Sequence, residues 1–246
     1  MPKHLILQLK WRIFKVSIFS LLFFVIFSPY SDWIDLKISH LFYHDGLFDT
    51  FPLWSAIYNY AIFPSWVAVI IGLLGLCCSL FATYRHWRAT CLLLVLTMAI
   101  GTGLIIHGIL KENWGRARPR QVTEFGGTQE FSPFYLPVHA QRQTGKSFAC
   151  GHCSMGFYFF CLEMCGLLYQ RRWLRNLGIT LAWSLGLLLS LARIAQGGHF
   201  LSDTIAAALI MWYTAAILAY FIFKNVALEV NLEPDLSKEP DLSKHT

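Results

Sequence analysis

Charged residues are scarce in this sequence, and their scarcity argues against an ordinary soluble domain. Aspartate, glutamate, lysine and arginine together make up 14% of the 246 residues, whereas soluble domains contain about 25%. Hydrophobic residues make up 56%, and the mean hydropathy is positive. The sequence therefore predicts a membrane protein, and one helical bundle accounts for its length.

A disulfide framework and a nucleic-acid-binding charge pattern are also lacking. The chain has seven cysteines, an odd number, and most lie in apolar runs where they are expected to pack as small hydrophobic side chains. Those cysteines are Cys77, Cys78, Cys91, Cys161 and Cys165. Much of the net charge of +6 falls at the ends of predicted helices, where membrane topology explains it.

Six apolar runs predict an all-α bundle with six transmembrane helices. The expected spans are residues 16–30, 58–81, 89–110, 150–169, 177–192 and 204–223. The first run is expected to remain as an anchor, because no small-x-small cleavage site follows it. Residues 32–49 are expected to be an interfacial segment. One domain would cover residues 1–228, and proline and charge favour disorder in a cytoplasmic tail, residues 229–246.

The basic residues predict the orientation of the bundle. Six spans place both termini on one side, together with the basic turns near Arg85 and Arg171, so this side is expected to be cytoplasmic. The polar stretches 111–147 and 190–203 then lie on the opposite side. Lysine and arginine are disfavoured there, which indicates that the stretch 111–147 needs its cations, and phosphate binding is the obvious need.

The stretch 190–203 carries the strongest sign of chemistry. Gly197-Gly198 is expected to end the helix that carries Arg193, and a new helix near His199 would place Asp203 on the same face. The carboxylate would then fix the tautomer of His199 and leave its other nitrogen free to attack. Arg193 would bind an anionic substrate. The alternative is an ion pair between Arg193 and Asp203, with His199 as an interfacial filler.

Two further stretches offer groups that bind anions. Lys111 and Arg118 lie near the end of the third span, where Pro119 favours an extended backbone; the alternative is a nonspecific anchor for lipid headgroups. The fourth span begins at Gly151-His152. Gly151 would let the backbone approach an anion, and His152 would protonate a leaving oxygen, unless it is only a capping histidine.

The three stretches together resemble the three-part motif of the type 2 phosphatidic acid phosphatase (PAP2) superfamily. In full they are Lys111-x6-Arg118-Pro119, Cys150-Gly151-His152 and Arg193-x5-His199-x3-Asp203. The resemblance implies that the phosphate is bound by Lys111, Arg118 and Arg193. It also implies that His199 attacks phosphorus, that Asp203 orients His199, and that His152 protonates the leaving group. Neither a metal nor a cofactor is expected.

Residues 147–157 and 196–200 are similar to the lipid A 4′-phosphatase branch of that superfamily. The similarity implies a phosphatase of the bacterial inner membrane that acts on a phosphate monoester of lipid A from the periplasmic side, through a phosphohistidine. Phosphatidylglycerophosphate and undecaprenyl pyrophosphate phosphatases share the motif and remain alternatives. The expected partners are a phosphorylated lipid and the bilayer. Nucleic acid and an obligate protein partner are not expected.

Cys150 departs from the Pro-Ser-Gly-His sequence that is usual in the family. The serine normally bonds the phosphate, whereas a thiol is a weak donor; we expect Cys150 to occupy the serine's place, with the N–H of Gly151 as a further donor. Two alternatives involve Cys153. One is zinc, for which a fourth ligand is not obvious. The other is a redox pair, which an oxidising periplasm would close into a disulfide.

Two ionisable residues in predicted spans, His107 and Glu163, suggest a transporter as the alternative to an enzyme. Transporters often contain an internal repeat, and this sequence shows none across its spans. Glu163 is therefore expected to bond across helices.

Overall fold

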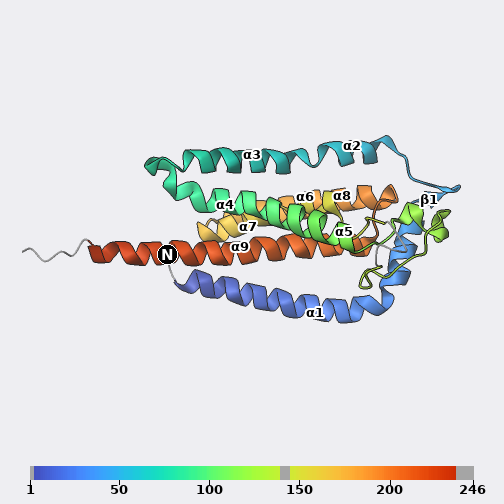
Figure 1. The fold of residues 1–246 in the computed structure, drawn as a ribbon, viewed down its shortest axis with the longest axis horizontal. Coiled ribbons are helices and arrows are strands. Elements are labelled where there is room, and N and C mark those ends of the chain that lie inside the picture. Colours follow the sequence, from blue (N-terminus) through green and yellow to red (C-terminus); the bar gives the residue numbers. More distant parts are fainter. Residues whose placement is uncertain (1–2, 139–144, 237–246) are drawn as a thin grey trace, which may run out of the picture.

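The computed structural model describes residues 3–138 and 145–236, and these residues are mostly helical. The described part contains one small sheet, a hairpin of β1 (Tyr43–His44) and β2 (Leu47–Phe48). The long helices run side by side in an elongated bundle (Figure 1). The predicted all-α class agrees with this architecture.

Five helical stretches in the described part are long and apolar enough to cross a membrane. They are His4–His40, Pro52–Cys78, Arg88–Asn113, Arg172–Ala195 and Leu201–Asn225. Each contains or overlaps one of the predicted spans. The predicted span 150–169 does not form one such helix, because it is divided into α6 (Gly151–Phe157) and α7 (Phe160–Leu168). The structure therefore supports a membrane bundle without establishing six continuous spans.

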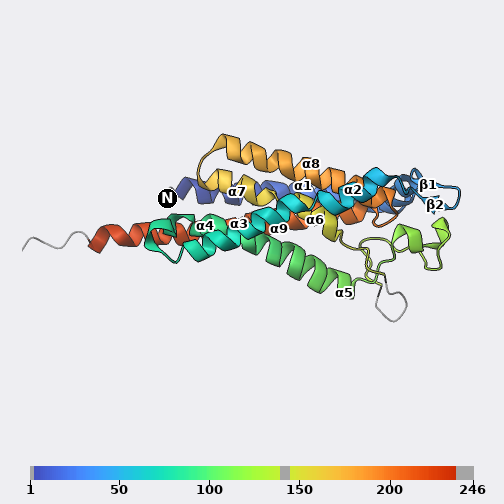
Figure 2. The same cartoon turned by 90° about the horizontal axis from the view of Figure 1, so that it is seen from above.

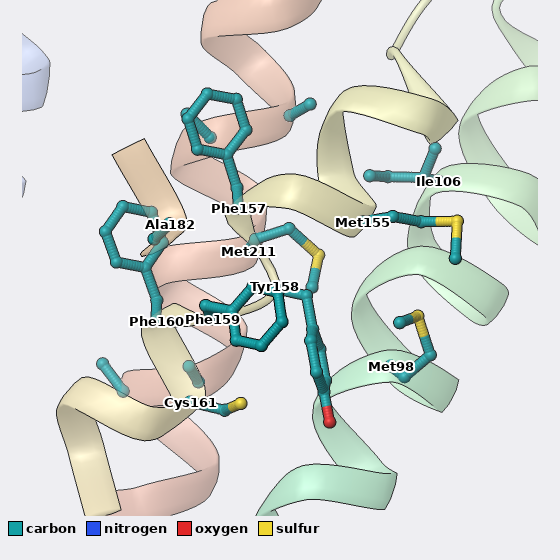
Figure 3. Close-up of a cluster of buried hydrophobic side chains, with 14 of the residues drawn as sticks. Met98, Ile106, Met155, Phe157, Tyr158, Phe159, Phe160, Cys161, Ala182 and Met211 are labelled. Carbon is teal, nitrogen blue, oxygen red and sulfur yellow. The ribbon is translucent and has the colours of Figure 1, made fainter. Parts of the chain in front are cut away.

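The break between α6 and α7 falls in a run of aromatic residues. All four side chains at positions 157–160 are buried, and they point in different directions into the core (Figure 3). The hydroxyl of Tyr158 donates to the carbonyl of Leu94 at 3.0 Å. In the bundle, α6 and α7 pack against α8 (Arg172–Ala195) and α9 (Leu201–Leu236). The broken span is thus the central helix pair of the fold.

The first helix is longer than the sequence predicts. α1 (Lys3–His40) continues through Pro29 and bends in its last third (Figure 1). A proline inside a helix removes one backbone hydrogen bond and causes such bends. Residues 32–40 of the expected interfacial segment are helical and continue α1. Asp35, which lies in this last part of the helix, is fully buried.

The second and third spans are also interrupted. α2 (Pro52–Tyr60) and α3 (Phe63–Cys78) follow one another in the same direction. After the turn η1 (Ala82–Trp87), the third span begins as α4 (Arg88–Leu96), becomes a π-helix, η2 (Thr97–Leu110), and ends as α5 (Lys111–Asn113). Two short 3-10 turns, η3 (Pro119–Gln121) and η4 (Thr123–Phe125), lie in the loop that follows.

Glu163 pairs across helices, as predicted. Its carboxylate accepts a hydrogen bond at 2.7 Å from Arg12 in α1, and its side chain is 7% exposed. A buried carboxylate that is neutralised in this way ties α7 to α1. At the C-terminal end, α9 remains helical to Leu236, beyond the predicted boundary at 228. The rest of the predicted tail lies outside the described residues.

Candidate active site

The predicted site residues come from separate elements that meet at one end of the bundle. α5, the end of α8 and the start of α9 all lie at the end that carries the β1–β2 hairpin (Figures 1 and 2). The N-terminus of α6 lies beside them, because the N–H of Cys150 donates to the carbonyl of Asp203 at 3.2 Å. Three stretches that are distant in the sequence are thereby assembled in one place.

His199 lies between α8 and α9, as the glycine pair predicts. Gly197 has a φ of 59°, a conformation that favours glycine, and it ends the helix that carries Arg193. The side chain of His199 is 2% exposed, and its Nδ1 lies 3.6 Å from Oδ2 of Asp203. This separation is longer than a hydrogen bond, but it places the carboxylate beside the ring.

The surroundings of His199 keep its ring neutral. Burial lowers the pKa of His199, Asp203 opposes the shift, and Arg193 and Lys111 add to it, so the pKa falls to about 4. The ring is therefore unprotonated at pH 7, and one nitrogen retains the lone pair that a nucleophile needs. Nδ1 has no hydrogen-bond partner among the described residues.

Asp203 is held by contacts that the sequence motif does not reveal. Its Oδ2 accepts hydrogen bonds from the hydroxyl of Ser147 at 2.6 Å and from the N–H of Phe200 at 2.9 Å. Its Oδ1 accepts from Nη1 of Arg116 at 2.6 Å. The carboxylate therefore has a fixed orientation before any substrate binds.

Arg116 is the main residue that the sequence interpretation missed. It is completely buried, and its guanidinium lies over the rings of Phe200 and Phe131, at 4.5 and 5.5 Å from their centroids. Burial lowers the pKa of Arg116, but the carboxylates of Asp203 and Asp35 outweigh this effect and raise it. In the sequence Arg116 is one of several cations of a polar loop, and nothing local distinguishes it.

Lys111 and His107 meet the backbone of Gly151. A Cβ added at Gly151 would lie 3.3 Å from Nζ of Lys111 and 2.5 Å from Nε2 of His107. A side chain at this position would displace the imidazole of His107, so the glycine lets His107 and Lys111 approach the start of α6. His107, considered above as part of a transport path, instead lies beside the predicted phosphate site.

Arg193 and His152 both contact an aromatic ring that the sequence did not single out. The guanidinium of Arg193 lies 4.8 Å from the centroid of Tyr58, and the ring of His152 stacks on Tyr58 with centroids 4.1 Å apart. Nη1 of Arg193 donates to Gln196 at 2.7 Å, whereas its Nε has no hydrogen-bond partner in the described part of the chain. Arg193 therefore retains a buried donor for a ligand.

Arg118 reaches the same region from the loop after α5. Its backbone is extended, with φ −83° and ψ 156°, as the following proline predicts. Burial, with a further contribution from Arg120, lowers the pKa of Arg118. Repulsion of this kind between neighbouring cations is relieved when an anion binds among them.

Cys150 and Cys153 form a disulfide, with their Cα atoms 5.3 Å apart. This is the redox alternative, and it corrects the expectation of a thiol donor, because a disulfide sulfur has no S–H. Sγ of Cys150 instead accepts the N–H of Cys153 at 3.1 Å and caps α6. Across residues 3–138 and 145–236, no three histidine, cysteine or acidic side chains are grouped to hold a metal ion, so the zinc alternative has no support in the geometry.

Comparison with known proteins identifies the family. Residues 90–227 match the PAP2 superfamily, and because the match covers more than half of the chain, the protein belongs to that superfamily. It is therefore a phosphatase of the PAP2 type. The three-part motif lies within the matched region.

Two relatives named lipid A 4′-phosphatase are similar to this chain. The protein of Francisella tularensis subsp. novicida is 29% identical over 234 residues, which cover 90% of this chain and 97% of that protein. The protein of Rhizobium leguminosarum is 33% identical over 130 residues, 50% of this chain and 52% of that one. Phosphatidylglycerophosphatase B of Escherichia coli K12 is 35% identical over 88 residues, 36% and 34% of the two chains. No solved structure matches.

Proposed function

We propose that this protein is a membrane lipid phosphatase that removes the 4′-phosphate monoester of lipid A. The observation that carries the reaction is the buried, neutral His199, which has a carboxylate beside one nitrogen and the cations Arg193 and Lys111 nearby. The nearly full-length similarity to a lipid A 4′-phosphatase supports the choice of substrate. Phosphatidylglycerophosphate and undecaprenyl pyrophosphate are the alternative substrates.

The first step forms a phosphohistidine. Nε2 of His199 attacks phosphorus while the bond to the leaving oxygen breaks, and His152, protonated when the phosphate is bound, donates its proton to that oxygen. Asp203 stabilises the positive charge that develops on the ring of His199. The phosphate oxygens are bound by Lys111, Arg118, Arg193 and the N–H of Gly151.

The second step releases inorganic phosphate. Water attacks the phosphohistidine, His152 accepts the proton that the water loses, and the bond between nitrogen and phosphorus breaks with its electrons returning to His199. Both histidines then have their starting protonation states. These residues complete the reaction without a metal ion or a cofactor.

We place the site on the periplasmic side of the bacterial inner membrane, with both termini in the cytoplasm. The basic α7–α8 turn, which contains Arg171 and Arg172, lies at the end of the bundle opposite the site (Figure 2). Cationic turns favour the cytoplasmic side. The disulfide beside the site gives independent support, because disulfides persist in oxidising compartments.

A phosphate-release assay with the purified protein tests the function. Lipid A, phosphatidylglycerophosphate and undecaprenyl pyrophosphate should be compared in the same detergent, with EDTA added to one set. We expect the highest kcat/KM for lipid A, a product that lacks the 4′-phosphate by mass spectrometry, and no effect of EDTA. A higher kcat/KM for either other lipid would replace lipid A as the substrate, and loss of activity in EDTA would contradict the metal-free mechanism.

A further inference from the structure

Asp35 belongs to α1, which lies outside the three stretches of the motif, yet it reaches the proposed catalytic centre. The side chain is fully buried, and both carboxylate oxygens accept hydrogen bonds from groups near His199. Oδ1 accepts the backbone N–H of Ser202 at 2.9 Å, and Oδ2 accepts from Arg116 at 2.8 Å. Asp35 therefore caps the first turn of α9, the helix that carries Asp203.

One guanidinium joins Asp35 to Asp203. Nη2 of Arg116 contacts Asp35, while Nη1 contacts Oδ1 of Asp203 at 2.6 Å and the hydroxyl of Ser202 at 2.7 Å. The two carboxylates and the guanidinium together carry a net charge of −1. All three side chains are buried, so water does not screen their charges effectively.

We propose that Asp35 is a positioning residue for the His199–Asp203 pair, and this inference rests on the proposed function. By sharing the positive charge of Arg116, Asp35 leaves negative charge on Asp203 for the ring of His199. Without Asp35, Arg116 would neutralise Asp203 alone, and the phosphorylated ring would lose part of its stabilisation.

The hydrogen-bond pattern requires a carboxylate at this position. The three groups that face Asp35, the N–H and the hydroxyl of Ser202 and the guanidinium of Arg116, are all donors. An asparagine offers one acceptor oxygen and one NH₂ group, so its NH₂ would have to face one of these donors. Asp35→Asn therefore removes the charge and at least one hydrogen bond while it keeps the size of the side chain.

The test compares Asp35→Asn with Asp32→Asn in the full-length protein, with lipid A as the substrate. Asp32 is in the same helix, and its carboxylate accepts a hydrogen bond from Ser31, one residue away. We expect Asp35→Asn to lower kcat about tenfold or more with KM within about twofold, and Asp32→Asn to match the wild type. In a single turnover at saturating substrate, Asp35→Asn should form phosphohistidine more slowly.

A double variant separates charge from structure. Asp35→Asn combined with Arg116→Gln again leaves a net charge of −1 on Asp203, so its kcat should exceed that of Asp35→Asn alone. A residue that only supported folding would give no such rescue, because a second buried contact is lost. If the double variant does not fold, the rate at which Asp35→Asn forms phosphohistidine in a single turnover distinguishes a positioning role from a purely structural one.

Two results would count against these proposals in different ways. A monodisperse Asp35→Asn protein with wild-type kcat and wild-type phosphorylation rate would overturn the positioning role alone. A wild-type protein that releases no phosphate from any of the three lipids would overturn the proposed function, and the positioning role with it.

Discussion

In the proposed mechanism, His199 is neutral before the reaction and positively charged during it. Burial and the neighbouring cations keep the ring neutral, with a pKa of about 4, and Asp203 lies 3.6 Å from Nδ1 to stabilise the charge that forms later. The neutral ring also affects stability. An unfolded histidine has a pKa of about 6.5, so the contribution of His199 is complete above pH 6.5 and is lost as the pH falls toward 4.

His199→Ala should abolish phosphate release while the protein still inserts into the membrane. Asp203→Asn should also lower phosphate release strongly, though less than His199→Ala does, because it removes the carboxylate beside the ring. Phosphate release from lipid A and trapping of the phosphohistidine at neutral pH would measure both effects. Near-wild-type turnover by His199→Ala would exclude it as the nucleophile.

Cys150→Ser combined with Cys153→Ala should retain activity within about threefold and should no longer respond to reductant. Serine is a good N-cap, so it would accept the N–H that Sγ of Cys150 accepts now. Cys150→Ala with Cys153→Ala should be about 1 kcal/mol less stable than the serine variant, because it also lacks the cap. Thermal unfolding and phosphate release should be measured with and without dithiothreitol. Strong inactivation of the serine variant would show that the disulfide itself is needed.

The sequence predicted the residues that share a local pattern and missed those that pair over long distances. Gly197, His199 and Asp203 follow one another within seven residues, so helix geometry was enough to relate them. Arg116 and Asp35 are 81 residues apart and form their ion pair only in the folded bundle. Before folding, neither residue has a neighbour that indicates its partner.

At the scale of elements, close helix contacts determine how α6 meets α8. A Cβ added at Gly156 would lie 2.5 Å from the backbone nitrogen of Gly186, and one added at Gly186 would overlap the ring of Phe157. Small residues let membrane helices approach this closely. Hydropathy predicted the positions of the helices. It could not predict the break between α6 and α7, because the residues at the break are as apolar as the helices before and after it.

Gly156→Ala should lower the thermal unfolding temperature, because the added methyl group meets the backbone of α8 and the helices must separate. Overpacking of this kind costs about 1–3 kcal/mol. Gly103→Ala in η2 is the matched control, since a Cβ there would make only an ordinary contact, 3.7 Å from the carbonyl oxygen of Met98. Unfolding should be followed in detergent for both variants. Equal stability of the two would show that α8 can move to accept the methyl group.

At the scale of the whole molecule, the candidate site and the α7–α8 turn lie at opposite ends of the bundle. The end with the α7–α8 turn carries arginines, and the opposite end carries the candidate site, the hairpin and the long loop (Figures 1 and 2). The sequence predicted this separation from its alternating basic turns. It did not predict how α1 bends across the site end, because the bend depends on tertiary contacts as well as on Pro29.

A reporter that is active only in the periplasm should be silent when fused after Phe223 and active when inserted in the loop 121–143. The prediction follows from the position of the basic turns opposite the site. Reporter activity should be normalised to the amount of fusion protein in the membrane. The reverse pattern would place the site in the cytoplasm and would also change the leaflet from which the substrate comes.

The bend in α1 also affects biosynthesis. The ribosome completes α1 long before α9, yet the Asp35 carboxylate in α1 binds the first turn of α9. Asp35 must therefore remain without this partner while the intervening helices enter the bilayer, and long-range contacts of this type form late. Because Asp203 also belongs to α9, the proposed pair of His199 and Asp203 cannot assemble before this helix is made, and we expect full phosphatase activity only after the last helix has docked against the first.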